Sequence, residues 1–255
     1  MTLILTPIRK IPFVHPGDDL ATIITDHLSE QSLSIEDGDI FVLAQKIVSK
    51  SENRYVPLSK VIPGEDARII AQKIEKDPRL VQLILDESIS VLRTRPGTII
   101  VEHKLGFICA NAGIDHSNVD SPTGQLDEWV LLLPIDPDAS AKAIRDRIFQ
   151  IAGRNVGVMI IDSHGRAWRN GVVGVTIGLA GVPGIIDMRG KPDLFGVQLR
   201  VTQIAAADEL AAAASLVMGQ ADESTPVIHV RGFPYPLRES TLRELIRPKE
   251  FDLFR

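Results

Sequence analysis

Cysteine and aromatic residues are scarce in this 255-residue chain, and basic residues are slightly outnumbered by acidic ones, with 28 Lys and Arg against 33 Asp and Glu. Its single cysteine, Cys109, permits no internal disulfide bond, which is typical of a protein from a reducing compartment. Because aromatic residues make up only 5% of the chain, the core must consist mainly of Val, Ile, Leu and Ala. The formal net charge of -5 argues against a dedicated nucleic-acid-binding protein, which needs a basic surface.

Signals for export and for membrane insertion are also lacking. Segment 1–12 has no strongly basic start, no long apolar core and no small-residue cleavage site of the signal-peptide kind. The longest stretch without charge, 170–186, contains five glycines and falls short of the roughly 20 apolar residues that span a bilayer. We therefore expect a cytoplasmic protein that binds neither a membrane nor nucleic acid.

The common nucleotide and hydrolase motifs are absent from the sequence. No G-x-x-x-x-G-K-[ST] occurs, because the nearest approach, 184–191, has the wrong spacing. No G-x-G-x-x-G follows a predicted strand, and H-E-x-x-H, C-x-x-C and G-x-S-x-G are missing as well. Any nucleotide site must therefore be built in another way.

Hydrophobic periodicity predicts a mixture of strands and helices. Helices are expected to begin near residues 20, 64, 78, 136 and 205, and strands are expected at 2–6, 40–44, 89–92, 98–102, 129–133, 156–161, 172–179, 199–204 and 227–230. The isolated glycines within 172–179 indicate bulges or a close backbone approach. Because the elements follow no strict βαβ rhythm, the pattern favours an α+β fold over a doubly wound sheet.

A first polar cluster spans 110–119, Ala-Asn-Ala-Gly-Ile-Asp-His-Ser-Asn-Val. Its small residues favour close backbone approach. The carboxylate of Asp115 can bind a hard cation, and the amide of Asn118 can hydrogen-bond a base or ribose. The alternative is an Asx-type turn that satisfies its own backbone.

A second cluster follows the strand predicted at 156–161, which would deliver Asp162 and Ser163 at its carboxyl end. A carboxylate followed by a hydroxyl suits Mg²⁺ or Mn²⁺ held against phosphate oxygens. Arg166 and Arg169 could clamp phosphate or carboxylate. The alternative is a hairpin turn at Gly165 with solvated arginines.

A third cluster, Gln45, Lys46 and Lys50, follows the strand predicted at 40–44 and is expected to form a polar loop. Its lysines could neutralise a triphosphate, whereas an exposed charged loop is the alternative.

Stretches 110–119 and 162–169 resemble two motifs of the coenzyme F-420:L-glutamate ligases. Similar features are Ile-Pro-Phe-Val at 11–14 with Pro-Gly-Asp-Asp-Leu at 16–20, Val-Ser-Lys at 48–50, and the Ala-rich helix that closes in Val-Met-Gly-Gln at 217–220. The resemblance runs from about residue 3 to about 232. It implies a ligase domain over 1–235 and a C-terminal tail over 236–255, which is similar to the linker of longer bacterial relatives that continue into a nitroreductase-like domain.

For the fold, the resemblance implies a mixed α+β architecture particular to this family, in which two protomers intertwine as a homodimer. It also implies GTP as co-substrate and two divalent ions, Mg²⁺ or Mn²⁺, with K⁺ as a further ion. The implied metal ligands are Asp115, Asp162, Ser163 and Gln220, with threonine in many relatives where Ser163 stands. The implied GTP contacts are Ile11, Pro12, Phe13, Val14, Gln45, Lys46, Lys50, Asn118, Leu216, Val217, Met218, Gly219 and Gln220.

For the chemistry, the resemblance implies that L-glutamate is joined through gamma-glutamyl amide bonds to a deazaflavin precursor. GTP would phosphorylate the terminal carboxylate of the precursor, and the glutamate amine would attack the acyl phosphate while metal ions offset charge. No catalytic base is indicated, although His116 and His164 lie in the two motifs. Two alternatives stay open: an ATP- or GTP-dependent ligase with a different amino acid or acid acceptor, and a non-catalytic deazaflavin-binding protein.

Overall fold

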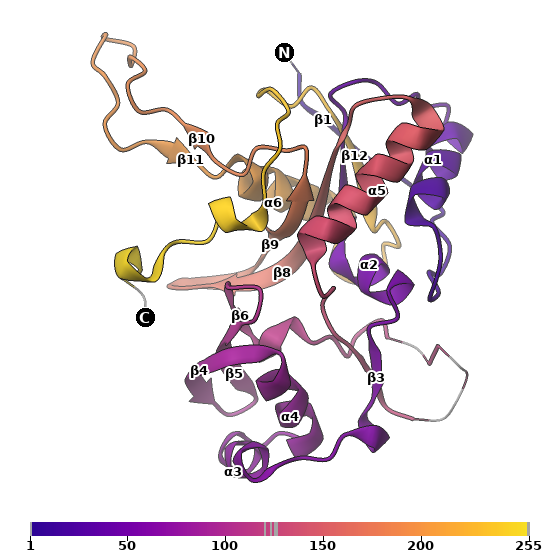
Figure 1. Ribbon diagram of the computed structural model, residues 1–255, viewed down its shortest axis with the longest axis vertical. Coiled ribbons are helices and arrows are strands. Elements are labelled where there is room, and N and C mark those ends of the chain that lie inside the picture. Colours follow the sequence, from indigo (N-terminus) through magenta and orange to yellow (C-terminus); the bar gives the residue numbers. More distant parts are fainter. Residues whose placement is uncertain (1, 120, 123, 125–126, 254–255) are drawn as a thin grey trace.

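The computed structural model describes residues 2–119, 121–122, 124 and 127–253. Met1 and the last two residues of the predicted tail, Phe254 and Arg255, lie outside the described residues. The fold is mixed α+β, as expected, and has two lobes (Figure 1). The large lobe is built on a five-stranded sheet, and the small lobe holds a three-stranded sheet with two helices.

The five-stranded sheet consists of β1 (Ile4–Pro7), β12 (Val227–Arg231), β2 (Ile40–Ala44), β8 (Gly157–Arg166) and β9 (Arg169–Ala180), in that order. Strands β2 and β8 are parallel, and the other neighbours are antiparallel. Successive side chains of a strand point to opposite faces. Phe41 and Leu43 accordingly join one hydrophobic core, whereas Ile40 and Val42 join another on the opposite face.

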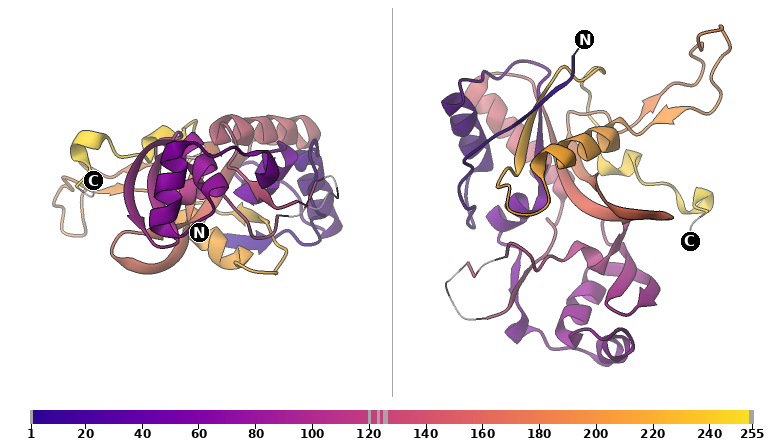
Figure 2. Two further views of the ribbon diagram at one scale, coloured as in Figure 1. Left: turned by 90° about the horizontal axis from the view of Figure 1, so that it is seen from below. Right: turned by 180° about the vertical axis from the view of Figure 1, so that it is seen from behind.

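Helices cover both faces of this sheet (Figure 2). Helices α1 (Leu20–Glu30) and α5 (Pro137–Ala152) pack on one face, and α6 (Ala206–Met218) packs on the other. Asp19 and Asp136 cap the N-termini of α1 and α5, because their carboxylates accept hydrogen bonds from backbone N–H groups of the first turns. Within the described part of the chain, no helix is long and apolar enough to cross a bilayer.

The small lobe contains β4 (Ser88–Arg95), β5 (Thr98–His103), β6 (Ile108–Ala110), α3 (Glu65–Ile74) and α4 (Pro78–Asp86). Strands β3 (Tyr55–Pro57) and β7 (Trp129–Leu131) pair beside it. Phe107 packs against the small-lobe core and against both cores of the large lobe. This phenyl ring therefore ties the two lobes together.

Three sequence-based expectations about elements are wrong. Residues Gln45–Ser51 form helix α2 rather than a polar loop. Strand β8 continues beyond Asp162 to Arg166, because residues 162–166 keep pairing with β9, and the hairpin turns at Trp168 rather than at Gly165. Of the strand expected at 199–204, only β11 (Gln203–Ile204) forms, paired with β10 (Ile186–Asp187) in an arm that projects from the large lobe.

The close backbone approach predicted for 172–179 is confirmed at Gly174. A Cβ atom there would lie 2.5 Å from Ser215 Cβ and 2.6 Å from Ala211 O, so a glycine is needed for α6 to pack this closely on β9. The contact brings the end of α6 beside the strand pair that carries Ser163.

The tail contacts both lobes. Leu242, in the short helix η3 (Leu242–Glu244), is buried, and its N–H donates to Asp138 Oδ2 of α5 over 2.9 Å. Lys249, in η4 (Lys249–Phe251), lies with Nζ 2.9 Å from Oε1 of Glu102, which is buried in β5. The segment after β12 therefore lies against the body of the protein.

Candidate active site

A cavity of about 840 Å³ brings together most of the side chains singled out from the sequence. Its lining includes Ile11, Pro12, Phe13, Val14, Gln45, Lys46, Lys50, Asp115, Asn118, Asp162, Ser163, Met218, Gly219 and Gln220. Leu216 and Val217 are not in this lining, and Leu216 is 85% exposed. The helical period explains this, because Ser215 and Met218 face inward while the two residues between them face outward.

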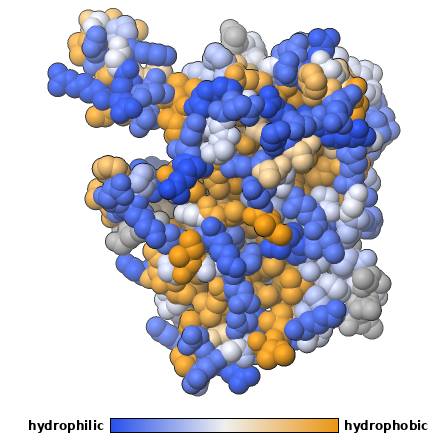
Figure 3. Space-filling view, viewed as in Figure 1, coloured by the Kyte–Doolittle hydropathy of each residue, from blue (hydrophilic) through white to orange (hydrophobic). Residues whose placement is uncertain are grey.

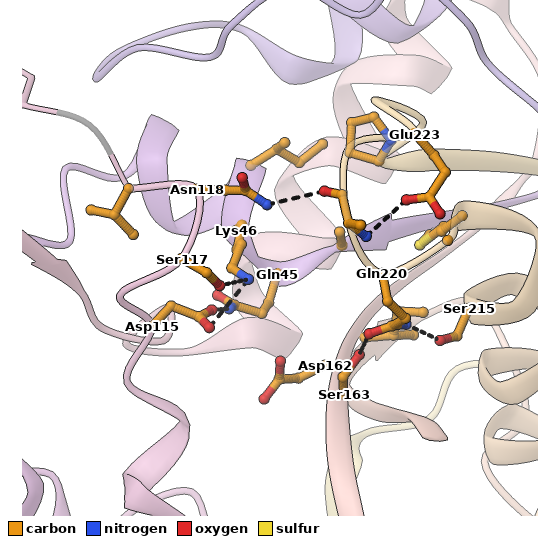
Figure 4. Close-up of a pocket in the computed structure, with 18 of the residues that line it drawn as sticks. Gln45, Lys46, Asp115, Ser117, Asn118, Asp162, Ser163, Ser215, Gln220 and Glu223 are labelled. Atoms are coloured by element: carbon orange, nitrogen blue, oxygen red, sulfur yellow. Dashed lines mark hydrogen bonds and ion pairs between the residues drawn. The ribbon is translucent and has the colours of Figure 1, made fainter. Parts of the chain in front are cut away.

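Asp115 is held on one side of the cavity by helix α2 (Figure 4). Its backbone forms a bridge with Leu131 of β7, through hydrogen bonds of 3.0 and 2.9 Å. Gln45 Nε2 donates to Asp115 Oδ2 over 2.5 Å, and Lys46 Nζ lies 3.2 Å from Asp115 Oδ1. Because α2 starts directly where β2 ends, its first two side chains reach the carboxylate together.

The Gln45 amide has a fixed orientation. The buried hydroxyl of Ser49, one helical turn later, donates to Gln45 Oε1 over 2.9 Å. The amide nitrogen is therefore directed at Asp115.

The carboxylate of Asp115 is half-buried and lies near a second negative charge. The pKa of Asp115 is raised to about 6, mainly by burial and also by the negative charge of Asp162, although the ammonium of Lys46 opposes both effects. The two carboxylates therefore repel each other electrostatically within one cavity. Such an excess of negative charge favours a cation.

Asp162 is held by its own strand. His164 Nε2 lies 3.0 Å from Asp162 Oδ2, and residues two apart on a strand share a face. The imidazole packs against Phe107 with a centroid distance of 5.2 Å, and Phe107 stacks on the buried ring of His103 at the same distance. The aromatic stack therefore restrains the imidazole that contacts Asp162.

The side chain of Ser163 contacts the loop after helix α6 rather than the residues around Asp115 and Asp162. Its Oγ donates to Gln220 Oε1 over 2.9 Å, and Gln220 Nε2 donates to Ser215 Oγ over 2.9 Å. The hydroxyl and the amide oxygen proposed from the resemblance as metal ligands thus touch each other directly (Figure 4).

Sequence reasoning missed one wall of the cavity. The loop after α6 lines it not only with Gly219 and Gln220 but also with residues 221–226. Asn118 Nδ2 donates to the carbonyl oxygen of Ala221 over 3.3 Å, and Glu223 Oε2 accepts from Ala221 N–H over 2.8 Å. The polar run Gln-Ala-Asp-Glu-Ser-Thr between a helix and a strand was the available signal for this loop.

Three further residues from the polar motifs lie outside the lining. Arg166 and Arg169 lie on the exposed β8–β9 hairpin, where Arg166 donates to Asn170 O over 3.3 Å. His116 lies with Nδ1 3.7 Å from Glu128 Oε1 rather than in the cavity, whereas His164 lines it.

The donor chemistry of the cavity fits a hard divalent ion. Among the described residues, no three His, Cys, Asp or Glu side chains gather as a metal-binding group. Two carboxylates, a hydroxyl and an amide oxygen nevertheless line the same cavity, from Asp115, Asp162, Ser163 and Gln220. Such oxygen donors are those that Mg²⁺ and Mn²⁺ prefer, with waters or phosphates completing the coordination.

Comparisons with known proteins identify the family of the chain. The model of the F-420-0:gamma-glutamyl ligase family matches residues 9–232. The chain is 44% identical to the coenzyme F-420:L-glutamate ligase of Methanothermobacter thermautotrophicus, over 100% of both chains. It is 46% identical to that of Methanococcus maripaludis, over 96% of this chain and 95% of the relative, and 45% identical to that of Methanocaldococcus jannaschii, over 87% and 86%. The chain therefore belongs to the F-420-0:gamma-glutamyl ligase family.

Proposed function

We propose that this protein is an enzyme that ligates L-glutamate, through gamma-glutamyl amide bonds, to the deazaflavin precursor of coenzyme F-420. The observation that carries the proposal is the match to coenzyme F-420:L-glutamate ligases over the whole chain. The cavity supports it, because the residues implied by the family motifs converge there from segments that are far apart in the sequence.

GTP is proposed as the co-substrate in this cavity. The volume of about 840 Å³ lies in the upper part of the usual range for ligand pockets, which suits a ligand as large as a nucleotide. Lys46 and Lys50, from one face of α2, supply positive charge for phosphates, and Ile11 to Val14 supply an apolar wall for a base or ribose. The loop 219–225 lines the same space and extends the set of proposed nucleotide contacts.

Two divalent ions, Mg²⁺ or Mn²⁺, are proposed at Asp115, Asp162, Ser163 and Gln220. When bound, they would offset the negative charge on the transferring phosphoryl group. The chain itself orients their donors: Gln45 and Lys46 hold Asp115, His164 holds Asp162, and Ser215 holds Gln220. K⁺ stays a further proposed ion.

The proposed reaction proceeds through an acyl phosphate. The γ-phosphoryl group of GTP moves to the terminal carboxylate of the precursor, and the free amine of glutamate then displaces phosphate to form the amide. The cavity walls contribute by orienting three anionic reactants, and such positioning can lower a barrier by roughly 7–11 kcal/mol. No side-chain nucleophile is required.

A homodimer is proposed as the working form. The arm beyond β10 and β11 projects from the body and exposes apolar side chains at its far end, with Leu194 99% and Phe195 90% exposed (Figures 1 and 3). Exposed apolar side chains of this kind are typical of a surface covered by another chain. Light scattering of the purified protein tests this, because a mass near 28 kDa would contradict it.

Mass spectrometry tests the function directly. The purified protein is incubated with GTP, Mn²⁺ or Mg²⁺, L-glutamate and the glutamate-free precursor. We expect mass gains in glutamate units, release of GDP and phosphate, and dependence on the metal, and the pattern of gains gives the number of glutamates added. GTP hydrolysis without glutamate addition would instead favour a ligase for another amino acid or acid acceptor. Precursor binding with GTP intact would favour a non-catalytic deazaflavin-binding protein.

A further inference from the structure

The loop after α6 contains a side-chain-to-backbone hydrogen bond that has no part in the proposed reaction. Glu223 Oε2 accepts the N–H of Ala221 over 2.8 Å. Further backbone N–H groups, those of Glu223 itself and of Gln220, also lower the pKa of this carboxyl group, so the acceptor is a carboxylate surrounded by main-chain donors. Glu223 therefore folds the loop back onto its own start.

The Glu223 carboxylate occupies the space next to the Cα atom of Gly219 where a side chain would otherwise lie. The φ of Gly219 is 78°, and a Cβ atom there would lie 2.1 Å from Glu223 Cδ. The backbone conformation therefore favours glycine, and the missing side chain leaves room for the carboxylate in this position. The packing of the carboxylate over Gly219 sets the direction in which the chain leaves α6 and enters the cavity wall.

The same peptide is also held from the other side of the cavity. The carbonyl oxygen of Ala221 accepts a hydrogen bond of 3.3 Å from Asn118 Nδ2, 103 residues earlier in the chain. Figure 4 shows Asn118 and Glu223 on the same side of the cavity, each joined by a dashed line to the backbone between them. Just before it, Gln220 directs its amide oxygen at Ser163 over 2.9 Å.

From this geometry we infer that Glu223 is a positioning residue for nucleotide binding: it holds the 219–225 loop so that Ala221 meets Asn118 and Gln220 meets Ser163. The inference rests on the proposed function, since it takes the ligand of the cavity to be a nucleoside triphosphate. Glu223 itself contributes no group to the chemistry. Its loss should weaken nucleotide affinity without unfolding the protein, because the side chain lies in an exposed loop.

Calorimetric titration of GTP with Mg²⁺ into four proteins tests the inference. The proteins are the wild type, Glu223→Ala, Glu223→Gln and the control Glu209→Gln, which changes an exposed carboxylate on α6 outside the cavity lining. We expect Glu223→Ala to weaken GTP binding by about 10-fold or more, because a charged acceptor of main-chain hydrogen bonds is lost. Glu223→Gln keeps one carbonyl acceptor and should recover most of the affinity, and the control should match the wild type.

A double-mutant cycle separates positioning from an independent contact. Because Asn118 and Glu223 hold the same peptide, Asn118→Ala combined with Glu223→Ala should cost clearly less than the product of the two single effects. Independent, multiplicative losses would overturn the inference. Unchanged binding by Glu223→Ala would overturn it too, and tighter binding would show instead that the carboxylate occupies an anion site that phosphate can take. Failure of the wild type to bind GTP would overturn the proposed function, which is a separate outcome.

Discussion

Asp115 and Asp162 offer the same chemical group to one cavity but are held there by different means. Asp115 depends on residues about 70 positions away, since Gln45 and Lys46 arrive on helix α2 and contact both of its oxygens. Asp162 depends on its own strand, where His164 two residues later contacts Oδ2. One carboxylate is therefore placed by tertiary structure and the other by local strand geometry.

Because of this difference, the two aspartates connect the site to both lobes through separate contacts. The backbone of Asp115 pairs with β7 while its side chain contacts α2 of the large lobe. Asp162 lies in the central sheet, but the imidazole that contacts it packs on Phe107, which touches the cores of both lobes. A change in the packing between the lobes is therefore expected to reach both carboxylates.

Removing either carboxylate is expected to have the largest effect. Asp115→Asn and Asp162→Asn should each lower the rate of glutamate addition by at least about 100-fold, because each loses a charge that the proposed metal ions require. Asp26→Asn, at an exposed position on α1, is the matched control and should keep the wild-type rate. Either variant at full activity would remove that aspartate from the proposed site.

The buried His103 should make the free energy of unfolding decrease at acidic pH. Burial lowers the pKa of His103 from its ordinary value of 6.5 to about 4. Between pH 6.5 and pH 4 the unfolded chain therefore binds more protons at this residue than the folded protein, so its contribution to the free energy of unfolding falls as the pH falls. The loss over this window amounts to about 3 kcal/mol.

His103→Phe keeps a ring beside Phe107 but cannot take up a proton. The variant loses the acceptor for Leu105 N–H, so it should be less stable at pH 7, yet its stability should fall less steeply between pH 6.5 and pH 4. Urea denaturation at several pH values measures both effects. Parallel stability curves for the two proteins would contradict the assignment.

The hydrogen bond from His164 is expected to matter for metal affinity rather than for folding. His164→Phe preserves packing on Phe107 but removes the contact to Asp162, and loss of such an orienting partner typically costs 10–100-fold in metal affinity. Binding of Mn²⁺ followed by electron paramagnetic resonance gives the affinity, and the melting temperature serves as the control. A large drop in melting temperature with unchanged affinity would assign His164 a structural role only.

The smallest effect is expected for the substitution Ser163→Thr. Ser163→Thr keeps the hydroxyl and adds a methyl group that suits a strand, so activity should stay within about threefold of the wild type. Ser163→Ala removes the hydroxyl that contacts Gln220 and should cost considerably more. Equal activity of the two variants would show that the hydroxyl is not needed.

The sequence predicted best the parts of the fold that follow from regular periodicity. The strand Ile40–Ala44 and the helix Pro137–Ala152 emerged because their apolar residues and caps match regular elements. The polar start of α2 was misassigned, since Gln45 and Lys46 are buried or paired by tertiary contacts that no local pattern encodes. The end of β8 was misplaced because a hairpin continues wherever its partner strand does.

The candidate site was predicted where a motif resemblance existed and missed where it did not. The convergence of Asp115, Asp162, Ser163 and Gln220 on one cavity agrees with the resemblance, although their role as metal ligands stays a prediction. Leu216 and Val217 were implied as GTP contacts by the resemblance of segment 216–220, but the helix turns them outward from the cavity. Ala221 and Glu223 were missed because their role lies in the backbone conformation of a loop.

Counting bound metal ions tests the central claim most directly, namely that two differently held aspartates act together on a metal–nucleotide complex. Mn²⁺ is titrated, with detection by electron paramagnetic resonance, into the wild type, Asp115→Asn and Asp162→Asn in the presence of a non-hydrolysable GTP analogue. We expect two ions per chain in the wild type and the loss of at least one ion in each variant. The same number of ions in all three proteins, or none in the wild type, would contradict the account.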